Sequence, residues 1–126
     1  TRVTDEGLIV EIFDIDGAPL FVNGTATPEP VAQDLARMIS EVFALAENEI
    51  AVNGFSRSLP IVLIKNPVWD LSTARAGAVR QLLEQQGTAS ARMQRIAGFA
   101  DRKPWAEDPM AIRNNRLEII LLRPKD

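Results

Sequence analysis

The 126-residue sequence contains no cysteine and no histidine. This double absence excludes cysteine-ligated zinc sites and both Ser-His and Cys-His nucleophilic catalysis, and it removes the most common general base. The chain also has no run of about 18 or more apolar residues, so no stretch of it is expected to span a membrane. The lack of cysteine fits a cytoplasmic location as well as a periplasmic one.

Charge of one sign is scarce in each half of the chain. Residues 1–50 hold ten acidic and two basic side chains, whereas residues 51–126 hold twelve basic and seven acidic ones. The basic half lacks the aromatic stacking platform that accompanies nucleic-acid binding, so no nucleic-acid partner is expected. Apolar residues make up 46% of the chain and charged residues 25%, which is ordinary for a globular protein, and the length favours one domain over residues 1–126.

Hydrophobic spacing and turn residues predict strands that alternate with two helices. The first helix is expected over 28–46, where Thr27 caps it and Pro28 opens it, and the second over 72–86, with Ser72 as its N-cap. Strands are expected at 8–13, at 18–22 as a short return from an Asp-Gly turn, and at 49–55, 92–99 and 117–122. The alternation indicates an α+β fold, βαβαβ plus a final strand, in which both helices cover one face of a mixed sheet.

One arginine occupies an unusual position in the second helix. With Ser72 as the N-cap, Arg75 lies in the first turn, where acidic residues are usual, and on the apolar stripe with Leu71 and Val79. A guanidinium beside unsatisfied helix N–H groups makes a site for a carboxylate or a phosphate. The alternative is that the stem of Arg75 packs on the core while its head reaches water.

Two other pairs of residues are weaker candidates. Asp14 and Asp16 flank a turn, where they could hold a metal or act in glycoside hydrolysis, but such aspartates more often satisfy backbone N–H groups. Trp69 and Trp105 could line a ligand groove near the second helix, but each is more simply a packing residue.

Four segments resemble motifs of the OmpA-like peptidoglycan-binding domains. Residues 69–76, WDLSTARA, resemble the helix start N-W-E-L-S-x-x-R-A, and residues 96–104, IAGFADRKP, resemble the strand and loop G-Y-G/A-E-x-x-P. Residues 114–119, NNRLEI, resemble the closing N-R-R-V-E-I. Residues 14–26, DIDGAPLFVNGTA, resemble the D-x-D-G-x-x-M-F-x-x-G-S-A segment of the MotB subgroup, the flagellar stator proteins. The resemblance extends over residues 8–123 and implies an OmpA-like α+β sandwich.

The resemblance also implies a non-catalytic domain that grips the stem peptide of peptidoglycan, with no metal and no cofactor. In this family an aspartate and an arginine hold the ammonium and the carboxylate of a diaminopimelate side chain, and Arg75 matches that arginine. Other pocket positions differ: Arg57 stands in place of the aspartate, Val68 in place of an asparagine, and Asn115 in place of the first arginine of the closing motif, whose second arginine is kept as Arg116. A cation at position 57 is expected to repel the ligand ammonium, with no carboxylate left there to pair it.

The predicted binding site joins Arg75 and the neighbouring helix N–H groups, which would hold a carboxylate, to Ser56 and Arg116 at the rim. Arg57 would either turn to solvent or bind a second carboxylate. The full set of residues that we expect to bind peptidoglycan is Ser56, Arg57, Val68, Asp70, Leu71, Arg75 and Arg116.

By this resemblance the chain is expected to be the C-terminal, periplasmic domain of an inner-membrane stator protein, with the membrane segment upstream of Thr1. It would anchor a flagellar motor to the cell wall, form a homodimer and work with a MotA-like subunit through the membrane part. One alternative is an outer-membrane-associated wall anchor of the same fold, such as a Pal-like lipoprotein. Another is a degenerate scaffold that serves dimerisation or docking and no longer binds the wall. A hydrolase is less expected, because histidine and cysteine are absent.

Overall fold

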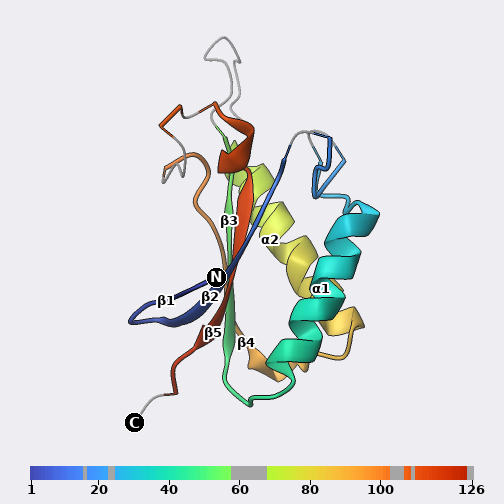
Figure 1. Ribbon diagram of the computed structural model, residues 1–126, viewed down its shortest axis with the longest axis vertical. Coiled ribbons are helices and arrows are strands. Elements are labelled where there is room, and N and C mark those ends of the chain that lie inside the picture. Colours follow the sequence, from blue (N-terminus) through green and yellow to red (C-terminus); the bar gives the residue numbers. More distant parts are fainter. Residues whose placement is uncertain (16, 23–24, 58–67, 103–106, 109, 125–126) are drawn as a thin grey trace.

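The computed structural model describes residues 1–15, 17–22, 25–57, 68–102, 107–108 and 110–124 (Figure 1). Within these residues the chain forms strands and helices in the order β1 Arg2–Val3, β2 Gly7–Phe13, α1 Pro30–Phe43, β3 Ile50–Phe55, α2 Val68–Gln85, η1 Ser90–Arg92, β4 Met93–Gly98, η2 Ile112–Asn114 and β5 Arg116–Leu122. The four long strands and both helices predicted from the sequence are present, whereas β1 and the two short 3-10 helices were not predicted.

The strands form a single five-stranded sheet in the order β1-β2-β5-β3-β4. β5, the last strand in the sequence, lies between β2 and β3 and is antiparallel to both, while β3 and β4 are parallel. The register places Phe13 and Phe55 on either side of Arg116. This mixed sheet confirms the predicted α+β class.

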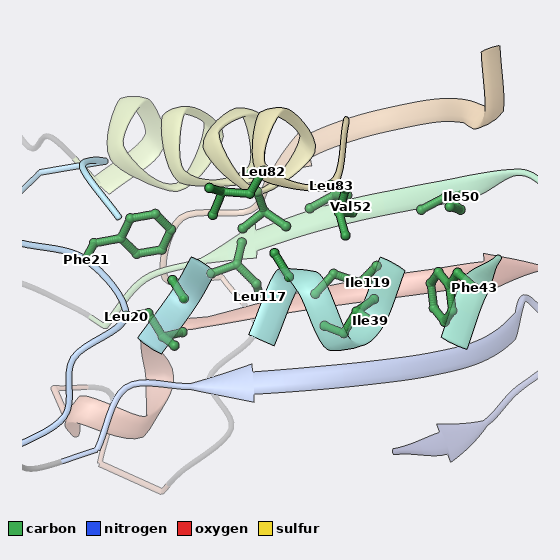
Figure 2. Close-up of a cluster of buried hydrophobic side chains, with 14 residues drawn as sticks. Leu20, Phe21, Ile39, Phe43, Ile50, Val52, Leu82, Leu83, Leu117 and Ile119 are labelled. Carbon is green, nitrogen blue, oxygen red and sulfur yellow. The ribbon is translucent and has the colours of Figure 1, made fainter. Parts of the chain in front are cut away.

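Both helices lie on one face of the sheet, as predicted, with α2 over β3 and β4 and α1 beside α2 (Figure 1). Alternate residues of the central strands point toward the helices, and Figure 2 shows Leu117 and Ile119 of β5 among helix side chains. The core comprises Leu20, Phe21, Ala32, Ala36, Ile39, Phe43, Ile50, Val52, Ala76, Val79, Leu82, Leu83, Leu117 and Ile119. The other face of the sheet has a smaller apolar cluster of Ile9, Ala51 and Ile120, and it carries charged side chains.

The segment before α1 differs from the prediction in two ways. α1 begins at Pro30 with Glu29 as its N-cap, so the second proline of the segment opens the helix, and Pro28 instead makes an isolated bridge with Phe21. The expected strand at 18–22 was wrong, because only isolated bridges form there. The physical reason is that the Leu20 N–H donates to a side chain rather than to a neighbouring strand, and that Leu20 and Phe21, although consecutive, are both buried in the core.

The start of α2 also corrects the prediction. The helix begins at Val68, so Ser72 lies inside it and is not the N-cap. The Ser72 side chain is fully buried, and its Oγ accepts a hydrogen bond of 3.0 Å from the backbone N–H of Ala100. Ala100 has a positive φ of 51°, a conformation that a non-glycine residue adopts only where its surroundings hold it. Ser72 therefore fixes the turn after β4 rather than the start of a helix.

Two glycines allow α2 to approach the sheet closely. A Cβ atom on Gly54 of β3 would lie 2.1 Å from the backbone oxygen of Ser72, and one on Gly98 of β4 would lie 2.6 Å from the backbone nitrogen of Thr73. Neither position has room for a side chain, because both contacts are with helix backbone. This packing sets α2 against the ends of β3 and β4, and it carries Arg75 to the edge of the core.

Candidate ligand-binding site

The side chain of Arg75 is buried at one end of the molecule. It is 4% exposed, its Nε donates a hydrogen bond of 2.8 Å to the backbone oxygen of Thr25, and its guanidinium carbon lies 5.0 Å from the centre of the Phe21 ring. Among the described residues, none accepts a hydrogen bond from its two terminal nitrogens. A buried guanidinium held at one nitrogen and at its face keeps its remaining donors for another acceptor.

The helix N–H groups expected beside Arg75 are not available to a ligand. Arg75 is the eighth residue of α2, which begins at Val68, so its own amide and its neighbours' amides lie within the helix. The prediction that Arg75 shares a carboxylate with the first turn was therefore wrong. Any anion that Arg75 binds must be held by side chains instead.

A cavity of about 230 Å³ opens beside Arg75. Three of its described lining side chains are charged, Asp14, Arg57 and Arg75, and these three sum to one positive charge. The remaining lining residues are Ile15, Gly17, Pro19, Phe21, Ile112 and Asn115. The cavity thus combines apolar walls with a few polar groups, as small-ligand sites commonly do.

Asp14 is part of this cavity, although the sequence favoured a role in the turn. Its carboxylate is 5% exposed, and Oδ1 accepts a hydrogen bond of 2.9 Å from the Leu20 N–H, which confirms that role. Oδ2 accepts a bond of 3.2 Å from Asn115 Nδ2. Asn115 Oδ1 in turn accepts a bond of 2.8 Å from the backbone N–H of Arg57. One amide side chain therefore links the carboxylate to the backbone that carries Arg57.

Asp14 adds to this cavity a carboxylate that the sequence did not place beside the two arginines. Burial lowers the pKa of the Arg75 guanidinium, the negative charge of Asp14 opposes that change, and the positive charge of Arg57 adds to it. Arginine remains protonated at neutral pH despite such shifts. Within the described part of the chain, no carboxylate lies within 4.0 Å of a nitrogen of either arginine. Neither arginine at this cavity is therefore neutralised by an ion pair with a described carboxylate.

Arg116, which was expected at the rim of the site, lies on the other face of the sheet. It is 5% exposed, and its guanidinium carbon lies 3.9 Å from the centre of the Phe55 ring. It lines a different cavity together with Arg2 and Glu118, which form an ion pair of 3.1 Å. Burial lowers the pKa of Arg116, while the nearby acidic side chains oppose the shift. The structure does not bring Arg116 together with Arg75.

The other described residues of the predicted site are not among those that line the cavity. Ser56 is buried, donates its hydroxyl to the backbone oxygen of Arg57 at 2.9 Å, and donates its own N–H to the Ala100 oxygen at 2.7 Å. Asp70 is exposed and Leu71 is half-buried. The following candidates lie outside the described residues: Asp16, Trp105, and the side chains of Val68 and Trp69.

No group of three or more acidic side chains is placed to hold a metal ion among the described residues. Neither described helix is both long enough and apolar enough to cross a membrane.

Comparison with known proteins decides the family. Residues 20–117 match the OmpA family. The chain belongs to the OmpA family. This OmpA-family chain is 30% identical over 123 residues to Motility protein B of Escherichia coli strain K12, a match that includes 95% of this chain and 40% of that protein. The chain therefore spans less than half the length of this curated relative.

Solved structures agree with this assignment. The periplasmic domain of Helicobacter pylori MotB superposes with a TM-score of 0.80 at 21% identity, covering 97% of this chain and 80% of that one, which shows a shared fold. The cell wall anchor of the type VI secretion system (T6SS) from Pseudomonas aeruginosa superposes with a TM-score of 0.75 at 28% identity, covering 92% of this chain and 81% of that one. The family resemblance predicted from the motifs, including its MotB character, is confirmed.

Proposed function

We propose that this OmpA-family domain is a non-catalytic, periplasmic peptidoglycan-binding domain that anchors a flagellar motor stator to the cell wall. Its similarity to Motility protein B supports the proposed role in a flagellar motor. Its similarity to a protein described as a cell wall anchor supports the proposed binding to the cell wall. The observation that carries the proposal is Arg75, a buried guanidinium whose terminal nitrogens are left for an acceptor beside a small cavity.

The chemistry of the cavity suits the stem peptide of peptidoglycan. Arg75 can bind a carboxylate through two parallel hydrogen bonds, the geometry that arginine favours. The apolar walls formed by Ile15, Pro19 and Ile112 would pack against the methylene groups of the same side chain. Ser56 would act as a positioning residue, since its hydroxyl holds the backbone of Arg57.

The proposal also includes the assembly expected of a stator protein. The domain would be the wall-binding part of an inner-membrane protein, working with a MotA-like subunit and self-associating as a homodimer. An outer-membrane-associated anchor of the same fold is the alternative that would use the same cavity. A scaffold without wall binding is favoured by one specific observation, the second cation at Arg57.

Retention on purified cell-wall sacculi tests the proposal. The wild-type domain should be retained, and Arg75→Ala should weaken binding at least about tenfold, because a desolvated arginine–carboxylate pair is lost. Arg75→Lys keeps the charge and should bind with intermediate affinity, and it serves as a second variant if the alanine variant is unstable. Arg37→Ala, on the exposed side of α1, is the matched control and should bind like wild type. Equal retention of all four proteins would contradict the proposal.

A further inference from the structure

The charges of the cavity define the ligand more narrowly than the fold does. We infer that the cavity of Arg57 and Arg75 recognises a carboxylate whose neighbouring amine is acylated, as in a cross-linked wall peptide, and disfavours the free ammonium form. This inference rests on the proposed function and adds a preference between two states of the same peptide.

Among its described lining residues, the cavity offers an ammonium group a single carboxylate. Asp14 is the one acidic side chain among the described lining residues, and each of its oxygens already accepts one hydrogen bond, from the Leu20 N–H and from Asn115 Nδ2. Arg57 and Arg75 both line this space, and the positive charge of Arg57 acts on Arg75. A partly desolvated ammonium placed there would meet more positive than negative charge, and an uncompensated buried charge is costly.

Two hydrogen bonds hold the backbone of Arg57 at the cavity wall, where its side chain can contact a ligand. Asn115 Oδ1 fixes its backbone N–H, the Ser56 hydroxyl fixes its backbone oxygen, and the side chain is half-buried at the cavity wall. A guanidinium has five donors and no acceptor, so the group opposite Arg57 must be an acceptor. An ammonium is also donor-only, whereas an amide carbonyl accepts.

The wall peptide can supply the required pair of acceptors. The side chain of a diamino acid such as diaminopimelate ends in a carbon that carries both an amine and a carboxylate. When that amine is free, a positive charge lies beside the carboxylate. When it is acylated by the neighbouring peptide, the charge disappears and a carbonyl oxygen stands in its place. Arg75 would then bind the carboxylate and Arg57 the carbonyl. The preferred target would be wall that is already cross-linked.

A pair of probes and a set of variants test this inference by calorimetry. The probes are a soluble stem peptide with a free diaminopimelate side-chain amine and the same peptide acetylated at that amine. Wild type should bind the acetylated probe about tenfold more tightly, given the size of partly desolvated charge interactions. Arg57→Asp should reverse the preference, because the new carboxylate pairs with the ammonium. Arg57→Gln should nearly abolish it, and Arg37→Asp, which makes the same charge change on exposed α1, should leave it unchanged.

The outcomes separate this inference from the function on which it rests. If wild type binds both probes equally, or binds the free amine more tightly, the inference is overturned and wall binding stands. An unchanged preference in a folded Arg57→Asp variant also overturns it. If wild type binds neither probe and is not retained on sacculi, the proposed function itself fails.

Discussion

At the scale of single residues, the contact that organises the cavity joins two residues far apart in the sequence. Asp14 and Asn115 meet because β2 pairs with β5, and the Phe13–Arg116 register brings the ends of the two strands together. The sequence identified Arg75 from its position on a helix stripe, and the resemblance named Asn115 as an altered pocket position, but Asp14 was not connected to either residue. The contact between Asp14 and Asn115 depends on the order of strands in the sheet, which local spacing does not reveal.

Asp14→Asn should test how much the structure depends on this carboxylate. The substitution replaces one acceptor oxygen with a donor NH₂ group, which would face either the Leu20 N–H or the Asn115 amide. We expect the free energy of unfolding to fall by about 1–3 kcal/mol, the cost of leaving a buried donor unsatisfied. Urea denaturation measures the change. The exposed Asp34→Asn substitution is the control and should change stability by less than about 0.5 kcal/mol. Equal stability of the two variants would rule out this role for Asp14.

At the scale of elements, the local sequence pattern predicted most of the helices and strands but not the contacts that particular side chains make. The β-branched runs and the helical stripes gave β2, β3, β4, β5 and both helices with small errors at the ends. The prediction for Ser72 was wrong because a serine near a helix start is usually the N-cap. Here the backbone N–H of Ala100, distant in the sequence, donates a hydrogen bond to the Ser72 hydroxyl oxygen. The run at 18–22 was misread because tertiary burial of Leu20 and Phe21 overrides strand propensity.

The close approach of α2 to the sheet predicts a large effect of one methyl group. In Gly54→Ala the new Cβ would lie 2.1 Å from the Ser72 backbone oxygen, so the helix must move away from β3. We expect a loss of about 2–3 kcal/mol in the free energy of unfolding, in the range found for overpacked cores. Gly77→Ala is the control within the same helix. Among the described residues, no atom outside the helix's own backbone lies within 4 Å of its new Cβ, and the substitution should stabilise the domain by up to about 1 kcal/mol. Thermal melts measure both effects. A shift of the two melting temperatures in the same direction would contradict the packing argument.

At the scale of the whole molecule, part of the charge contrast between the two halves is neutralised within the chain itself. Arg95 pairs with Glu6 at 2.9 Å, and Arg2 bridges Glu11 and Glu118 at 3.1 Å each. The Arg95–Glu6 pair joins the basic half to the acidic half, whereas Arg2–Glu11 lies within the acidic half and Arg2–Glu118 joins a base of the acidic half to an acid of the basic half. The acidic and basic halves therefore leave less charge for pairing with a second copy than the sequence alone indicates.

The self-association proposed for the domain should consequently be weak. We expect a monomer at micromolar concentration and a growing dimer fraction only toward about millimolar protein, as for small and polar interfaces. Added salt should reduce the dimer fraction, because exposed charge pairs are screened. Sedimentation over a concentration series at two ionic strengths measures both effects. A constant monomer across the series would show that this part of the chain does not dimerise.

The position of β5 has a consequence for the order in which the domain can be completed. Synthesis proceeds from the N-terminus, yet the strand at the centre of the sheet is the last to be made. Until residues 116–122 emerge, β2 and β3 each keep an open edge, and Asn115 cannot yet hold Asp14 and Arg57 together. A chain terminated before β5 would lack both its central strand and its cavity. A chain that ends before β5 therefore cannot form the cavity that would bind a ligand.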